Sequence, residues 1–276
     1  MAKSTAPVWG VNSTLITTAQ QYVVKAGSEV GNGSSNDTHV AFETGATAFI
    51  FENGNVGDDT LLNFSSNDTI LNTKQIFDGN GDGFIAFGAN GVLDIDRESK
   101  KKAGADQIQV VGADDKDLTE LRYLGTKDGL FAYADSANLK NLWTKFGAAN
   151  VMEGTVGNDT KSFADGDKVL LVDNALGLNL GADTLTGFGS GDLLAFTSKL
   201  YDRTGNGVVS FGTNNVLDVS GATGPQPTDP KFGPGGQIDF ASPEHLDVKF
   251  LGQETIKGVT YYYYGTDETA SPVVTN

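Results

Sequence analysis

Residues 57–94 read GDDTLLNFSSNDTILNTKQIFDGNGDGFIAFGANGVLD, and residues 181–218 read GADTLTGFGSGDLLAFTSKLYDRTGNGVVSFGTNNVLD. The two stretches align without a gap at a constant offset of 124, and 17 of their 38 positions are identical. Other positions exchange residues of one class, as Phe77 and Tyr201 do. Similarity over this length predicts a chain built from two copies of one structural unit.

The similarity extends outward from these stretches and sets the expected boundaries of the two units. Residues 36–38 resemble 158–160, and residues 129–133 resemble 258–262. The simplest arrangement is pseudo-twofold, either as one body or as two domains. We expect an N-terminal segment over 1–29, a first β unit over 30–135, a helical linker over 136–151, a second β unit over 152–267 and a C-terminal tail over 268–276.

Short apolar runs predict strands through most of the chain. Residues 107–111 and 168–172 are such runs, and Gly, Asn and Asp interrupt the sequence between them. Residues 136–149 differ, because four apolar side chains there recur at helical spacing. The sequence also allows a second short helix near 117–122. The sequence therefore predicts an all-β fold, a β-sandwich or short β-roll body, with one or two short helices.

A motif with oxygen-bearing side chains follows the first strands. Asp78, Asn80 and Asp82 occupy alternate positions, followed by Gly83 and Phe84. This is the first half of an EF-hand-like loop, in which the three side chains and a backbone carbonyl, here that of Phe84, bind Ca²⁺. The acidic residue that usually closes such a loop is missing, since Ala89 stands there. The alternative is a turn rich in Asp and Asn without metal.

The second copy of this motif keeps oxygen ligands but carries less negative charge. Asp202, Thr204 and Asn206 stand at the matching positions. Because fewer carboxylates bind Ca²⁺ more weakly, a site formed by Asp202 and Asn206 would be the weaker of the two, and a plain turn without metal is favoured here.

A second motif, Gly-x-Asp-Thr-Leu, occurs at 57–61 and 181–185, with related pieces at 157–160 and 191–194. These pieces resemble the repeats-in-toxin (RTX) family of type I-secreted proteins, whose Gly- and Asp-rich nonapeptides form a parallel β-roll. The resemblance implies that Asp59 and Asp183 are calcium ligands and that Ca²⁺ drives folding outside the cell. It also implies secretion without a cleaved N-terminal signal peptide. Since the chain has no continuous run of nonapeptides, we expect a short body rather than a long regular roll.

Composition excludes several other classes of protein. The net charge is −16, which disfavours binding to nucleic acid, and the chain has no Cys for disulfides or thiolate metal sites. The apolar runs are too short for a transmembrane segment. Only two His are present, His39 and His245, so a zinc site with three imidazoles is excluded.

Two functions from different classes fit these observations. The first is a secreted calcium-binding protein, without enzymatic activity, that acts in adhesion or in matrix or surface association. The alternative is a secreted lyase, isomerase or hydrolase with structural calcium and a pocket lined by Tyr, Arg and Asp between the two halves. A carbohydrate or small apolar ligand and self-association remain open. The residues to inspect for such a pocket are Arg97, Arg122, Arg203 and the tyrosine run 261–264.

Overall fold

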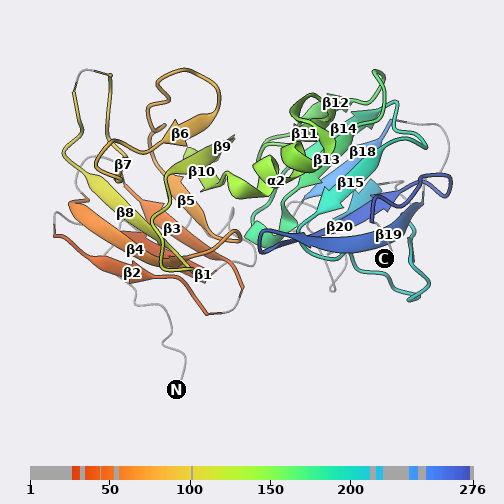
Figure 1. Ribbon diagram of the computed structural model, residues 1–276, viewed down its shortest axis with the longest axis horizontal. Coiled ribbons are helices and arrows are strands. Elements are labelled where there is room, and N and C mark those ends of the chain that lie inside the picture. The colour runs from red at the N-terminus through yellow and green to blue at the C-terminus, as the bar shows by residue number, and fades with distance from the viewer. Residues whose placement is uncertain are drawn as a thin grey trace. The chain divides into compact units, whose positions relative to one another are not determined.

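The computed structural model describes residues 27–31, 35–43, 45–52, 56–100, 102–211, 216–219, 236–241 and 247–273. The chain divides into two compact units, residues 1–136 and 137–276. Strands dominate both units, so the predicted all-β fold is confirmed (Figure 1). Among the described residues, no helix is long and apolar enough to cross a membrane.

The first unit consists of two sheets. The four-stranded sheet has the order β2 (Thr38–Val40), β4 (Asp58–Phe64), β8 (Gln107–Gly112) and β7 (Leu93–Asp94). The six-stranded sheet has the order β1 (Gly27–Gly31), β3 (Thr47–Phe51), β5 (Thr69–Asn72), β10 (Leu130–Asp135), β9 (Glu120–Lys127) and β6 (Phe84–Ala86).

The chain alternates between these two sheets from β1 to β5, as the strand labels in Figure 1 show. Within each sheet the successive strands are parallel, β1 with β3 and β5, and β2 with β4. Each pass through both sheets is therefore one coil of a short β-roll. The antiparallel hairpin of β9 and β10 then completes the six-stranded sheet.

The second unit has the same strand orders. Its six-stranded sheet runs β11 (Val151–Glu153), β13 (Val169–Val172), β15 (Leu193–Phe196), β20 (Val259–Gly265), β19 (Val248–Ile256) and β16 (Val208–Val209). Its four-stranded sheet runs β12 (Thr160–Ser162), β14 (Ala182–Thr186), β18 (Gln237–Phe240) and β17 (Val216–Asp218). The two orders correspond strand by strand to those of the first unit. An origin by duplication stays our interpretation of the sequence.

Apolar side chains of both sheets form the core of the first unit. Strand β3 is buried along its whole length, and β4 alternates between buried and more accessible positions. Alternation is expected where only one face of a sheet packs inward. Phe49 stacks on Phe64 with 5.9 Å between ring centroids, which joins the two sheets through their facing side chains.

The predicted helix is present as α2 (Ala137–Phe146). The short 3-10 helices η1 (Ala148–Asn150) and η2 (Asn174–Leu176) follow it. The second short helix that the sequence allowed near 117–122 does not form. Strand β9 begins at Glu120, and the amide of Leu118 donates to the Val110 carbonyl. Pairing of β9 with both β6 and β10 overrides local helix propensity there.

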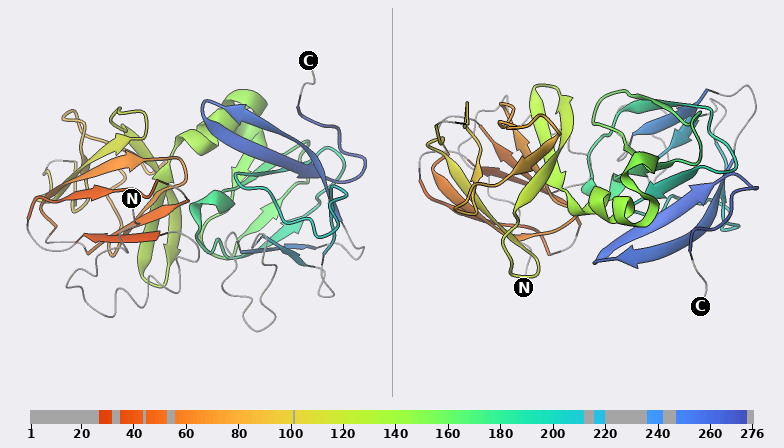
Figure 2. Two further views of the ribbon diagram at one scale, coloured as in Figure 1. Left: turned by 90° about the horizontal axis from the view of Figure 1, so that it is seen from below. Right: turned by 45° about the horizontal axis from the view of Figure 1, so that its top comes forward.

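The tyrosine run 261–264 lies in β20, between β15 and β19. Tyr261, Tyr263 and Tyr264 are all buried, although strict alternation along a strand would bury only two of the four tyrosines. Both faces of β20 are covered, by α2 on one side and by the core on the other (Figure 2). The Tyr261 hydroxyl donates to the Asn138 carbonyl at 2.7 Å, and Tyr264 packs against Phe196.

One buried hydroxyl has the same role in both units. The Tyr133 hydroxyl accepts the Ile76 amide at 2.7 Å, and the Tyr264 hydroxyl accepts the Leu200 amide at 3.0 Å. Burial raises the pKa of Tyr264 to about 12, so this hydroxyl is neutral at any physiological pH. These bonds tie the last strand of each unit to the segment that leads into a candidate calcium loop.

We expect Tyr133→Phe and Tyr264→Phe each to lower the free energy of unfolding by about 1–2 kcal/mol, because each leaves a buried amide without its acceptor. Urea denaturation followed by fluorescence measures this loss. Tyr201→Phe is the matched control, since Tyr201 is 46% exposed. Equal stability of all three variants would contradict the role of these bonds.

Candidate metal site

The first candidate site is the Asp78 loop, defined as residues 78–84, which leads into β6. The Asp78 carboxylate accepts three backbone N–H groups: Oδ1 takes those of Asn80 at 3.1 Å and Gly81 at 2.8 Å, and Oδ2 takes that of Gly83 at 2.8 Å. The loop therefore wraps closely around its first side chain.

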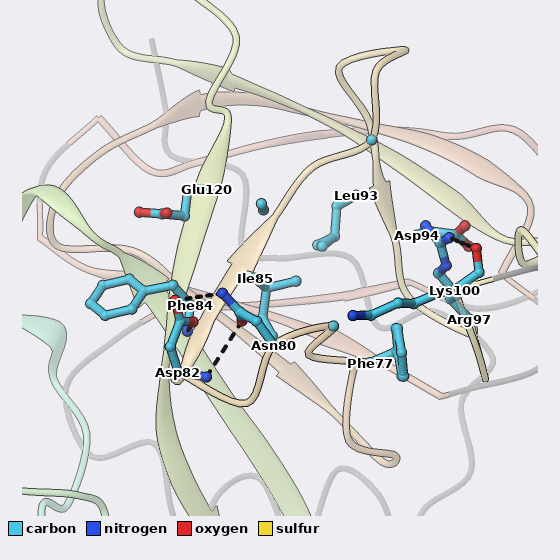
Figure 3. Close-up of a pocket in the computed structure, with 13 residues that line it drawn as sticks. Phe77, Asn80, Asp82, Phe84, Ile85, Leu93, Asp94, Arg97, Lys100 and Glu120 are labelled. Atoms are coloured by element: carbon cyan, nitrogen blue, oxygen red, sulfur yellow. Dashed lines mark hydrogen bonds between the residues drawn. The ribbon is translucent and has the colours of Figure 1, made fainter.

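Two further oxygen-bearing side chains of the loop lie beside one another (Figure 3). The Asn80 amide nitrogen donates to Asp82 Oδ2 at 2.8 Å, and Asp82 Oδ1 accepts the Phe84 amide at 2.9 Å. Three of the four predicted ligands are thus side chains of one compact turn. Phe84 stands at its end and pairs with Arg122 in the sheet.

Glycine allows this loop to close. Gly81 and Gly83 have φ values of 75° and 83°, in the left-handed region that side chains other than Gly rarely adopt. This backbone turns the N–H groups of both glycines toward Asp78. The motif in the sequence therefore encodes the loop geometry directly.

The Asp202 loop, residues 202–208, has the same bonding pattern in the second unit. Asp202 Oδ1 accepts the amides of Thr204 at 2.9 Å and Gly205 at 2.8 Å, and its Oδ2 accepts that of Gly207 at 2.6 Å. Asn206 Oδ1 accepts the Val208 amide at 2.9 Å. The two loops differ in charge and not in backbone design.

The hydrogen bonds to the two leading aspartates change their acidity. Slight burial raises the pKa of Asp78, but its three amide donors outweigh this effect and leave the pKa below its usual value. For Asp202 the Gly207 amide is the largest cause of a lowered pKa. Both side chains are therefore carboxylates at neutral pH, as a hard-cation ligand must be.

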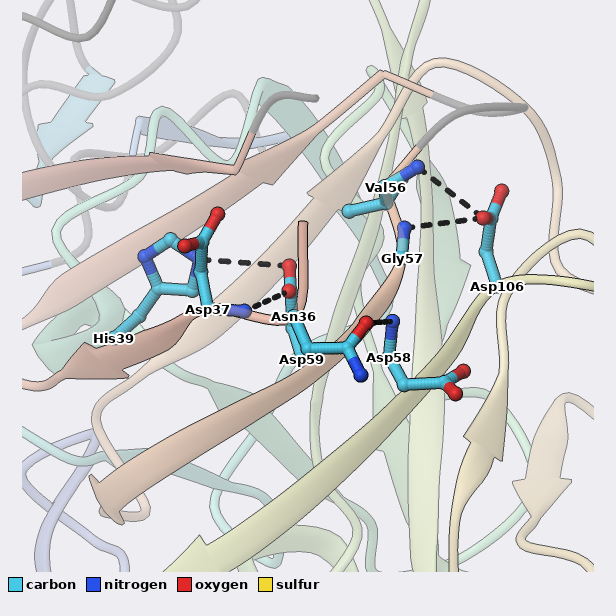
Figure 4. Close-up of polar contacts among 8 residues, drawn as sticks. All are labelled: Asn36, Asp37, His39, Val56, Gly57, Asp58, Asp59 and Asp106. Atoms are coloured by element: carbon cyan, nitrogen blue, oxygen red, sulfur yellow. Dashed lines mark hydrogen bonds and ion pairs between the residues drawn. The ribbon is translucent and has the colours of Figure 1, made fainter. Parts of the chain in front are cut away.

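The predicted ligands Asp59 and Asp183 are buried and lie between coils of the β-roll (Figure 4 for the first unit). Asp59 Oδ1 accepts the amide of Asp37 at 2.8 Å, and Asp183 Oδ1 accepts that of Asp159 at 2.9 Å. Asp59 Oδ2 lies 3.5 Å from Nε2 of His39. The observed bonds give both aspartates a structural role; their predicted metal ligation stays a prediction.

Another pair of buried aspartates, Asp68 and Asp192, is not among the predicted ligands. Asp68 Oδ1 accepts the Thr47 amide at 2.7 Å, and Asp192 Oδ1 accepts the Lys168 amide at 2.9 Å. Burial raises the pKa of both carboxyls. The sequence contains a sign of this shared role, because Asp68 and Asp192 occupy matching positions in the two aligned stretches.

The structure does not bring all the predicted ligands together. Asp59 lies between coils, whereas Asp78, Asn80 and Asp82 form their own turn. Among the described residues, no group of three or more His, Cys, Asp or Glu side chains is placed to hold a metal ion. The Asp78 loop supplies only two carboxylates, and its other oxygens come from an amide and the backbone.

The arginines and histidines considered in the sequence analysis lie in different surroundings. Arg122 is buried and donates to the Asp135 carbonyl, so it supports the sheet. Arg97 lines a cavity beside the Asp78 loop, and Arg203 is exposed. His245 lies outside the described residues.

Comparison with known proteins finds no matching protein family, no similar curated protein and no matching solved structure.

We expect Asp78→Asn to lower the melting temperature in EGTA more at pH 7 than at about pH 3. A carboxylate with a lowered folded-state pKa stabilises the fold above the unfolded pKa of about 4, and this contribution disappears as the pH falls through the folded value. Thermal melts at both pH values measure the gap from wild type. Asp58→Asn, on an exposed side chain, is the control. A gap of the same size at both pH values would contradict the prediction.

Proposed function

We propose that the chain is a secreted calcium-binding β protein without enzymatic activity, in which Ca²⁺ bound by the Asp78 loop stabilises the first unit. The observation that carries this proposal is a single turn in which Asp78 accepts the Gly83 amide and the side chains of Asn80 and Asp82 lie in contact. Carboxylate, amide and carbonyl oxygens are the ligands that Ca²⁺ prefers. The role that fits such a protein is adhesion, or association with a matrix or cell surface.

The charge of the chain supports this proposal. A net charge of −16 destabilises a compact fold through self-repulsion, and bound divalent cations reduce that repulsion. The chain has no disulfide to stabilise its small β units. Calcium binding would add stability according to its affinity and free concentration.

The resemblance to RTX proteins supports export by a type I route. Each unit is a short roll of parallel coils whose turns carry Asp and Gly, as the resemblance implies. Since free Ca²⁺ is scarce in cytoplasm and abundant outside cells, we propose that the chain completes its folding after export. In this proposal, the chain binds Ca²⁺ and becomes fully stable only outside the cell.

The test is calcium binding measured together with stability. We expect Ca²⁺ to raise the melting temperature relative to EGTA, and isothermal titration to detect the stronger site at the Asp78 loop. Asp82→Asn should weaken this site about tenfold or more, because it removes one of only two carboxylates.

Asn206→Asp is the matched variant in the second unit. It restores the charge that the Asp202 loop lacks at this position, so we expect it to strengthen calcium binding there. The opposite directions of these two variants separate ligation from general destabilisation. A melting temperature and titration heat unaffected by Ca²⁺ would disprove the proposed function.

A further inference from the structure

A cavity of about 340 Å³ lies against the Asp78 loop in the first unit (Figure 3). Asn80 and Asp82 form one wall, and Phe77, Arg97 and Lys100 form another. A second cavity of about 570 Å³ shares Phe77 and Arg97 and is lined by other residues of the loop. The candidate metal loop therefore stands between two hollows that an external molecule can enter.

Arg97 is held in a fixed position at the boundary of both cavities. Its Nε donates to the Ser99 carbonyl at 2.8 Å and its Nη2 to the Lys100 carbonyl at 2.7 Å. Its guanidinium carbon lies 5.9 Å from the centroid of the Phe77 ring. Since a guanidinium has five N–H donors, these two bonds leave others for a ligand, and a planar fork suits a carboxylate.

Lys100 brings a second cation to the same place. A side chain at Gly79 would meet the Lys100 Cε at 3.5 Å, so the lysine stem packs along the loop at a position without a side chain. Its ammonium group points into the cavity (Figure 3). The side chain is exposed, and within the described part of the chain it has no ion-pair partner.

This pair of cations is unusual on a chain with a net charge of −16. The segment that supplies them, 97–102, reads RESKKK, and calcium binding alone gives it no role. Phe77 adds an apolar wall between the cations and the loop. Asp94 and Glu120 also line this cavity, so its positive charge is confined to Arg97 and Lys100. Beside these two side chains and Phe77, the cavity matches a ligand that combines an anionic group with an apolar face.

The Asp78 loop alone does not supply enough oxygen ligands for Ca²⁺. Ca²⁺ takes about six to eight oxygen ligands, and the position that usually supplies a closing carboxylate is occupied by Ala89. Water or oxygens of another molecule must supply the missing ligands. Because Asn80 and Asp82 line the cavity, a molecule in the cavity is close enough to provide them.

We propose that this cavity binds a carboxylate-bearing sugar in a calcium-dependent manner. Arg97 and Lys100 bind the sugar carboxylate, Phe77 contacts the apolar face of the ring, and sugar oxygens complete the coordination of Ca²⁺ at the Asp78 loop. This inference rests on the proposed function and names the ligand class for the same site.

The experiment is isothermal titration of the full chain with tri-galacturonate, in Ca²⁺ and in EGTA. We expect binding in Ca²⁺ and a loss of at least about tenfold in affinity in EGTA. Arg97→Gln and Lys100→Gln should each weaken binding about tenfold, as expected for loss of a charge-assisted contact. Lys257→Gln, which changes an exposed lysine outside both candidate calcium loops, is the control and should bind as wild type does.

Melting curves of each variant with Ca²⁺ separate this inference from the proposed function. If Ca²⁺ raises the melting temperature but tri-galacturonate does not bind, the sugar site is wrong and the calcium proposal stands. Binding that Arg97→Gln and Lys100→Gln leave unchanged would place the ligand elsewhere. Equal binding of neutral galactotriose or of inorganic phosphate would overturn the ligand class. Binding of equal strength in EGTA would overturn the role of calcium in ligand binding.

Discussion

Hydrogen bonds from backbone amides of one coil to aspartate side chains of the next coil hold each β-roll together. Asp59 and Asp68 accept amides of Asp37 and Thr47 in the first unit. A turn between parallel strands leaves N–H groups that the sheet ladder cannot pair, and a buried unpaired amide costs free energy. The short aspartate side chain reaches these amides across the spacing between coils.

This arrangement has a consequence for metal binding between coils. At Asp59 and Asp183 one carboxylate oxygen accepts an amide of the preceding coil, so both side chains have a structural role without an ion. At Asp59 the other carboxylate oxygen faces His39, whereas the second unit has Lys161 at the aligned position. In this structure hydrogen bonds satisfy the coil turns directly, and the Asp78 loop is the better candidate for an ion because Asn80 and Asp82 are exposed to solvent.

Much of this structure could be predicted from the sequence, because local signals agree with the fold. The aligned stretches predicted two units, the spacing of Leu139, Leu142 and Phe146 predicted α2, and the glycine pattern predicted the shape of the Asp78 loop. Each of these features is encoded within a few residues. They do not depend on knowing which segments meet.

Features that depend on distant contacts could not be predicted in this way. The sequence aligned Tyr133 with Tyr262, yet the residue that accepts the matching amide in the second unit is Tyr264. The hairpin of the second unit is longer, β19 having 9 residues where β9 has 8, and β20 having 7 where β10 has 6. In the sheets Tyr133 pairs with Ile70, and Tyr264 pairs with Leu194, the residue that aligns with Ile70. The structural match therefore differs by two residues from the sequence match, and a comparison of the hairpin ends without gaps cannot detect this shift.

Comparison of the Asp78 and Asp202 loops shows which of their residues the backbone geometry requires and which residue differs only in charge. Both begin with an aspartate that accepts three amides, and both have glycines with positive φ, so the backbone geometry is the same without any ion. The fifth position differs, Asp82 in one loop and Asn206 in the other, although both side chains accept the amide two residues on. Asparagine is sufficient for that hydrogen bond. The negative charge of Asp82 is therefore not needed to form the turn, and in the proposed function this charge serves to attract Ca²⁺.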